Sequence, residues 1–84
     1  MPLSDVRRDW AVFAREGEVA IGAVRRVAPD HLVIYLEGFG DVSVAAAQVA
    51  AVHDAKVVID PERMPQHVRA AIARAHDREG DGQA

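Results

Sequence analysis

The sequence has 84 residues, of which 50% are hydrophobic, with a formal net charge of −3 and no cysteine. A chain of this length supports one hydrophobic core, so we expect a single domain over residues 1–84. Without cysteine, neither a disulfide nor a thiolate metal site can form, which favours a reducing cytoplasm. No stretch resembles a secretory signal or approaches the roughly 18 apolar residues of a membrane span, so we expect a soluble cytoplasmic protein without membrane contact.

The charged residues are spread along the chain without a basic cluster. Residues 1–28 carry five Arg against four acids, residues 29–60 carry one Lys against five acids, and residues 61–84 carry four of each sign. Nucleic-acid binding draws on clustered Lys and Arg, so we expect no nucleic-acid partner. Arg outnumbers Lys nine to one and Ala is abundant, which is typical of a GC-rich bacterial genome.

The first third of the chain shows two short apolar runs with a turn between them. Residues 11–14 are apolar, and the tight turn 15–18 follows, which predicts a strand and a connection. Over residues 19–28 the apolar residues begin with a two-residue period that slips at Gly22. A β-bulge at Gly22 would explain the slip, because one extra residue re-aims a strand and glycine tolerates the backbone angles.

The middle of the chain predicts further short strands. Pro29 fits the second position of a turn over residues 28–31. Strict alternation then predicts strands at 31–36 and 41–44, and the apolar run 56–59 is the last strand candidate. The small residues 45–50 are typical of a helical turn, and residues 53–55 turn the chain once more.

The hydrophobic period changes after Ile59. Val68, Ala71, Ile72 and Ala75 recur at the spacing of one helix face, which predicts a helix over residues 65–79. Pro65 suits a helix start, Gly80 suits a stop, and residues 80–84 are expected to form a frayed tail. The sequence therefore predicts a mostly β protein, a small antiparallel β-barrel of five to six short strands over residues 5–59 with a C-terminal α-helix.

Seven stretches carry a resemblance to a known family: 5–12, the turn 16–18, 21–24 with Val27, 32–34, 42–44, 49–52 and 57–59. Together they resemble the PRC-barrel domain, the family named for the photosynthetic reaction centre H subunit and including the C-terminal domain of the ribosome maturation factor. The resemblance implies a non-enzymatic module that docks on other proteins, and it carries over no catalytic residue. Two departures are Glu16, where the family usually has Asp, and the added helix 65–79.

The four histidines raise the possibility of a metal site. His67 and His76 are nine residues apart, which places them on opposite sides of a helix. They cannot share an ion within one chain, and we expect no metal and no cofactor. The alternative function that stays open is a small-molecule or metal-binding protein or enzyme that uses His53, Asp54 or Glu37.

Nucleophilic catalysis lacks suitable residues, because the sequence has neither cysteine nor threonine and only two serines.

Trp10, Phe39 and Met64 stand at the ends of expected elements, where a large apolar side chain either fills the core or anchors a partner. The alanine-rich face of the helix suits packing on its own barrel or on a second subunit. We therefore predict a protein–protein interaction module with an unknown protein partner, and a homodimer is one form of it.

Overall fold

The structure is a computed structural model. It describes residues 3–81, without the side chains of residue 4 and of residues 76–81. Within these residues the chain is mostly β-strand with one long helix near its C-terminal end, as the sequence predicts. The elements in chain order are η1 (Leu3–Asp5), β1 (Ala11–Phe13), β2 (Gly22–Val27), β3 (His31–Leu36), β4 (Gly40–Ala45), η2 (Ala46–Gln48), β5 (Val49–His53), β6 (Lys56–Ile59), η3 (Pro61–Arg63) and α1 (Gln66–Asp81).

The six strands form one sheet in the order β4-β3-β2-β1-β6-β5. Four of the neighbouring pairs are antiparallel, but β1 and β6 run parallel, with Val12 opposite Val57. The expected closed antiparallel barrel is therefore a mixed sheet whose two edges are β4 and β5. It curls into a half-barrel, and the reason for its mixed character is that the first strand pairs with the last.

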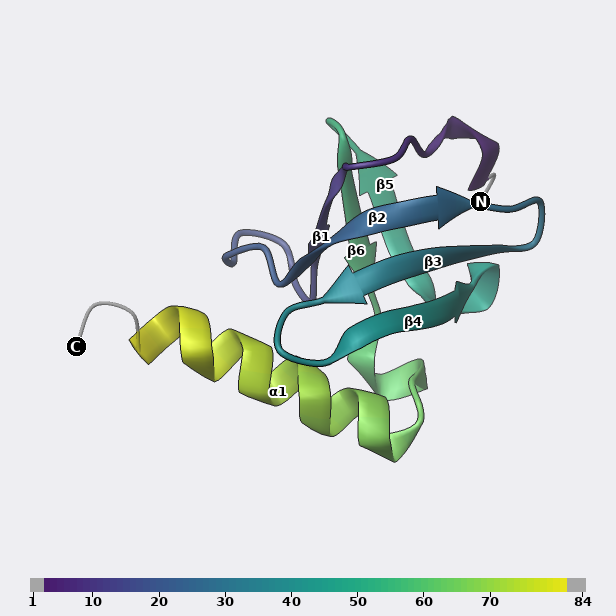
Figure 1. The fold of residues 1–84 in the computed structure, drawn as a ribbon. Coiled ribbons are helices and arrows are strands. Elements are labelled where there is room, and N and C mark those ends of the chain that lie inside the picture. Colours follow the sequence, from purple (N-terminus) through teal and green to yellow (C-terminus); the bar gives the residue numbers. More distant parts are fainter. Residues whose placement is uncertain (1–2, 82–84) are drawn as a thin grey trace.

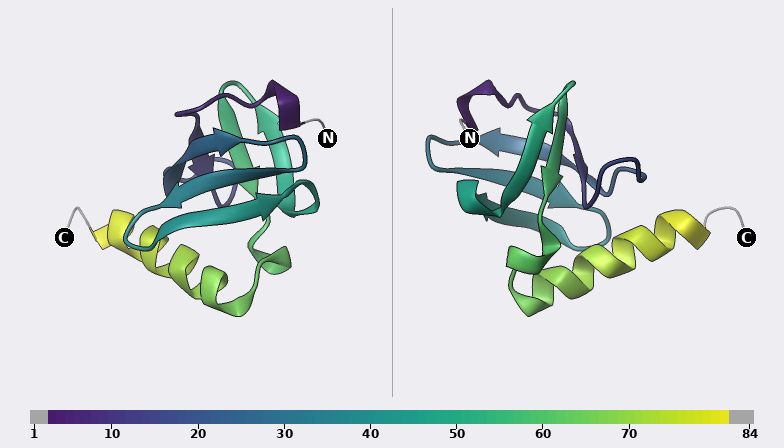
Figure 2. Two further views of the ribbon diagram at one scale, coloured as in Figure 1. Left: turned by 45° about the vertical axis from the view of Figure 1, so that its right-hand side comes forward. Right: turned by 180° about the vertical axis from the view of Figure 1, so that it is seen from behind.

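The curled sheet has two arms that cross steeply, as Figures 1 and 2 show. We call β2, β3 and β4 the hairpin arm, because these strands follow one another along the chain. We call β1, β6 and β5 the crossover arm, because it joins the beginning of the chain to residues 49–59. Helix α1 lies beside the open side of the half-barrel, and the N-terminal segment crosses the opposite side (Figure 1).

The core lies in the hollow of the half-barrel. Alternation places Leu32, Ile34 and Leu36 of β3 in it, while the residues between them are half-buried on the outer face. Leu3 and Val6 close the core on one side, and the apolar face of α1 closes it on the other. The helix residues in the core are Val68, Ala71, Ile72 and Ala75, as their spacing predicts.

Gly22 begins β2, and the predicted bulge lies three residues further along. The register of β2 against β3 shifts between Val24 and Arg26, which places the extra residue at Arg25. Gly22 itself is needed for close approach, because a Cβ atom there would lie 1.9 Å from the backbone oxygen of Tyr35. The strand therefore contains a bulge, as the phase slip predicts, but the predicted position at Gly22 was wrong.

A short corner connects the two edges of the sheet. The helical turn expected over residues 45–50 is confined to η2, and β5 begins at Val49. The Gln48 side chain holds the corner in place: its Oε1 accepts from the Ala45 backbone N–H at 2.8 Å, and its Nε2 donates to the Arg63 carbonyl at 3.0 Å. Arg63 in turn donates to the Ala47 carbonyl at 3.3 Å, so η2 and η3 are tied together.

Helix α1 differs from the expected range at both ends. It begins at Gln66, with the Pro65 carbonyl accepting from the Arg69 backbone N–H at 2.9 Å. It continues through Gly80 to Asp81, so Gly80 does not end it, and residues 82–84 of the expected tail lie outside the described residues. Glycine permits a helix end but does not impose one, since its cost inside a helix is only about 1 kcal/mol.

Candidate functional site

The edge strand β4 is regular along its whole length. It pairs with β3 from Gly40 opposite Leu36 to Ala45 opposite His31 without a register shift. Val42 and Val44 face the core, whereas Asp41, Ser43 and Ala45 are exposed on the outer face. A regular edge of this kind presents backbone N–H and C=O groups that can pair with a further strand, except at Ala45, whose N–H already donates to Gln48 Oε1.

The other edge, β5, is interrupted. The register of β5 against β6 shifts between Val49 and Ala51, so Ala50 is an extra residue in the edge strand. A bulge twists an edge and breaks the row of backbone groups, which is one of the devices that keep edges from pairing. The bulge therefore hinders pairing of a further strand with β5, whereas no bulge hinders pairing with β4.

A small polar cluster marks the outer face beside β4. The Arg25 guanidinium lies over the Tyr35 ring, 4.9 Å from its centroid, and its Nε lies 3.3 Å from the Asp41 carboxylate. Both charged side chains are more than half exposed, so the pair adds little stability. It fixes the position of the Asp41 carboxylate beside the free edge.

The three apolar residues predicted as core or anchors lie in different environments. Met64 is buried in the core, and Trp10 is half-buried against it. Phe39 is 43% exposed in the turn between β3 and β4, with its ring 6.3 Å from the His67 ring. Of the three, Phe39 alone offers a large exposed apolar surface, and it lies next to the β4 edge.

The alternative residues His53, Asp54 and Glu37 do not come together as one set. His53 and Asp54 are in contact, with 3.2 Å between His53 Nδ1 and the Asp54 carboxylate. The second partner of His53 is Glu16, whose carboxylate lies 2.5 Å from Nε2. Glu37 follows β3, and three strands of the sheet separate β3 from β5. In the part of the chain that the structure describes, no group of three His, Cys, Asp or Glu side chains could hold a metal ion.

Two histidines lie beside carboxylates, His53 beside Glu16 and Asp54, and His31 beside Asp30. The hydrogen bond with Glu16 raises the pKa of His53 above its usual 6.5, and the contact with Asp54 acts in the same direction. In the turn between β2 and β3, the hydrogen bond with His31 lowers the pKa of Asp30 below its usual 3.8. All these side chains lie at the surface, so a change in their protonation does not require the core to rearrange.

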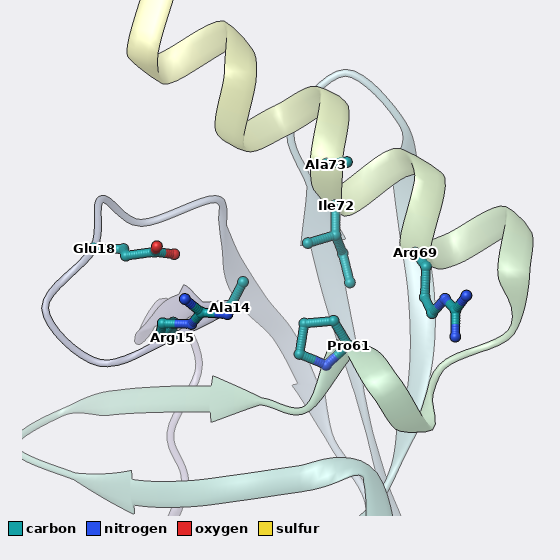
Figure 3. A pocket seen from close by; sticks show the side chains of 7 residues that line it. All are labelled: Ala14, Arg15, Glu18, Pro61, Arg69, Ile72 and Ala73. Carbon is teal, nitrogen blue, oxygen red and sulfur yellow. The ribbon is translucent and has the colours of Figure 1, made fainter.

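A cleft of about 370 Å³ opens between the loop after β1 and the helix α1 (Figure 3). Its walls come from distant parts of the chain: Ala14 and Arg15 from the loop, Pro61 from η3, and Ile72 from α1. The remaining lining residues are Glu18, Arg69 and Ala73. Sequence reasoning missed this cleft, because local patterns do not show that the loop and the helix converge.

A second cleft of about 420 Å³ adjoins the first, since Ala14, Arg15 and Pro61 line both. It reaches the bulge residue Ala50 and the outward side chain of Val58. Its rim is more acidic, with three carboxylates from Glu16, Asp60 and Glu62. Asp60 is already engaged, because it accepts from the Glu62 backbone N–H and pairs with Arg63.

Comparison of the chain with protein-family models, with curated proteins and with solved structures found no significant match. None of the helices in the described part of the chain combines the length and apolar composition that crossing a membrane requires.

Proposed function

We propose that this chain is a non-enzymatic protein-interaction module of the PRC-barrel type, working in the bacterial cytoplasm, and that its β4 edge pairs with the β4 edge of a second copy. The observation that carries the proposal is the unequal protection of the two edges. Strand β4 is regular and pairs fully with β3, whereas β5 carries a bulge. Adding a strand to an exposed edge is a common mode of protein recognition.

The sequence of β4 suits pairing with itself. In a two-fold arrangement centred on Ser43, the antiparallel strands place Ser43 opposite Ser43 and Asp41 opposite Ala45. No two like charges then face each other directly, and the valines of both strands stay on the core side. Phe39 lies at the end of the strand and adds apolar surface beside the contact.

The burial pattern supports the non-enzymatic part of the proposal. All buried side chains among the described residues are apolar. Acid–base chemistry commonly relies on ionisable groups whose pKa is shifted by burial. The pKa shifts of His53 and Asp30 are instead caused by exposed hydrogen-bond partners.

The size of the contact sets the expected strength. Two short edge strands bury less than the roughly 1,200 Å² of a standard interface, so the association is expected to be weak and reversible. Light scattering after size-exclusion chromatography tests it over loading concentrations from about 10 µM to about 1 mM. We expect the mass to rise from that of the 9.1 kDa monomer toward twice that value.

The matched variants are Ser43→Lys and Ser43→Thr. A lysine in an edge strand opposes pairing, because two copies would bring like charges together, whereas threonine keeps the β-propensity. We expect Ser43→Lys to remain a monomer over the whole range and Ser43→Thr to behave like the unmodified chain. An unmodified chain that stays monomeric at about 1 mM contradicts the proposal, and so does a Ser43→Lys variant that dimerises as well as the parent.

A further inference from the structure

The cleft between the loop after β1 and α1 lies apart from the β4 edge and combines an apolar floor with two arginines. Ile72 forms a nearly buried part of the floor, and Ala14 and Pro61 are half-buried beside it. Arg15 enters from the loop and Arg69 from the helix, on either side of Pro61 (Figure 3). Both arginines are exposed.

Neither arginine is neutralised within the described residues. Arg25 pairs with Asp41, and Arg63 pairs with Asp60, but the guanidinium groups of Arg15 and Arg69 have no hydrogen-bond or ion-pair partner there. Glu18, the one acid that lines this cleft, makes an interaction of its own. Two arginines and one carboxylate thus border an apolar surface, so the cleft is positive on balance.

This combination favours a ligand that carries carboxylates next to an apolar group. A guanidinium presents a planar fork of donors that matches a carboxylate in shape and charge. The cleft volume of about 370 Å³ lies near the lower end of the range of ligand sites, about 300–1,000 Å³. That volume suits an aliphatic side chain with its neighbours and is small for a nucleotide cofactor.

We propose that this cleft binds an acidic and apolar segment of a protein partner, with carboxylates at Arg15 and Arg69 and an aliphatic side chain against Ile72 and Pro61. The inference rests on the proposed function as an interaction module and adds the chemistry of the partner. It uses a surface other than β4. The failure of one proposal can therefore be told apart from the failure of the other, because the solution mass reports β4 pairing and a peptide titration reports binding in the cleft.

The test is a titration of the isotope-labelled full chain with three short peptides, followed by backbone amide chemical shifts. The first is acetyl-Gly-Glu-Leu-Glu-Gly-amide, the second has Gln in place of both Glu, and the third has Ser in place of Leu. We expect saturable shifts at residues 14–15 and 69–73 with the first peptide. The Gln and Ser peptides are each expected to bind at least about three-fold more weakly.

Variants of the protein complete the test. Arg15→Gln and Arg69→Gln are each expected to weaken binding of the first peptide by about two- to five-fold, the value of an exposed ion pair. Arg26→Gln is the matched control, because Arg26 is an exposed residue of β2 that does not line the cleft. Shifts that do not saturate, equal affinity for the Gln peptide, or an equal loss with Arg26→Gln would overturn the proposal.

Discussion

The hairpin arm and the crossover arm are built in different ways. In the hairpin arm, β2, β3 and β4 follow each other along the chain and each pairs with the next. In the crossover arm, β1 pairs in parallel with β6, which joins residues 11–13 to residues 56–58. The first arm depends on local turns, whereas the second depends on contacts that form only when two distant parts of the chain meet.

The turns of the two arms also differ. Pro29 stands in the turn between β2 and β3, where its fixed φ fits the second position. The hairpin between β5 and β6 turns at Asp54 and Ala55, whose φ angles are 51° and 62°. Positive φ at both central residues is the geometry of a type I′ turn, which favours glycine at the second of them. The crossover arm therefore contains a strained turn that the hairpin arm lacks.

The largest expected effect comes from the joint between the arms. Gly22 pairs with Val12 of β1 and Leu36 of β3, and a Cβ atom there would meet the Tyr35 oxygen at 1.9 Å. Gly22→Ala is expected to lower the free energy of unfolding by about 3 kcal/mol or more, because the strands must move apart. Chemical denaturation measures the change.

Gly17→Ala is the control for this substitution. Gly17 has a φ of 81°, but a Cβ atom there would meet nothing within 4 Å. Gly17→Ala should lower the free energy of unfolding by only about 1 kcal/mol, the value for a left-handed alanine. A Gly22→Ala variant as stable as Gly17→Ala would show that the two arms are not joined as closely as described.

A smaller effect of opposite sign is expected in the crossover arm. Ala55→Gly should raise the free energy of unfolding by about 1 kcal/mol, because glycine adopts a positive φ without strain. The exposed Ala55 side chain loses little packing. Ala51→Gly in the neighbouring strand should lower stability instead, since that residue has no positive φ to relieve. An Ala55→Gly variant that loses stability, as Ala51→Gly is expected to do, would contradict a strained turn at Ala55.

The smallest effect concerns pH. The pKa of His53 is raised above 6.5 by Glu16 and Asp54, so the charged form is favoured in the folded chain. Its stabilising contribution is complete below pH 6.5 and is lost as the pH rises through the folded pKa. Denaturation curves at several pH values should show this loss in the parent and not in His53→Gln.

In the hairpin arm, the stability that Asp30 contributes depends on pH in the opposite direction. The pKa of Asp30 is lowered by His31, so its contribution to stability is present above pH 3.8 and is lost as the pH falls through the lowered pKa.

His67→Gln, which removes a histidine outside both pairs, is the control for the His53 experiment. A His53→Gln variant that keeps the slope of the parent above pH 6.5 would disprove the role of His53.

The predictable part of the fold is the local part. Alternation predicts β3, and an apolar run predicts β6, both with the bounds that the structure shows. The helical spacing identifies four buried residues of α1. The parallel pairing of β1 with β6 was not predictable, since a hydrophobic period identifies a strand but not its neighbour. The same limit explains why a closed antiparallel barrel was expected in place of an open mixed sheet.

The candidate surfaces were less predictable than the fold. Trp10, Phe39 and Met64 look alike in the sequence, and only the packing shows that Phe39 is the exposed one. His53 and Asp54 are adjacent in the sequence, but their partner Glu16 lies 37 residues from His53 and was not predicted. Whether an edge is regular or bulged depends on its register against the neighbouring strand, which the sequence does not reveal.

Amide hydrogen exchange at rising protein concentration tests directly whether β4 pairs between copies while β5 does not. We expect the amides of residues 40–45 in β4 to become more protected as the concentration rises, while those of residues 49–53 in β5 keep the same exchange rates. Protection that is independent of concentration in β4, or that rises equally in β5, would contradict it.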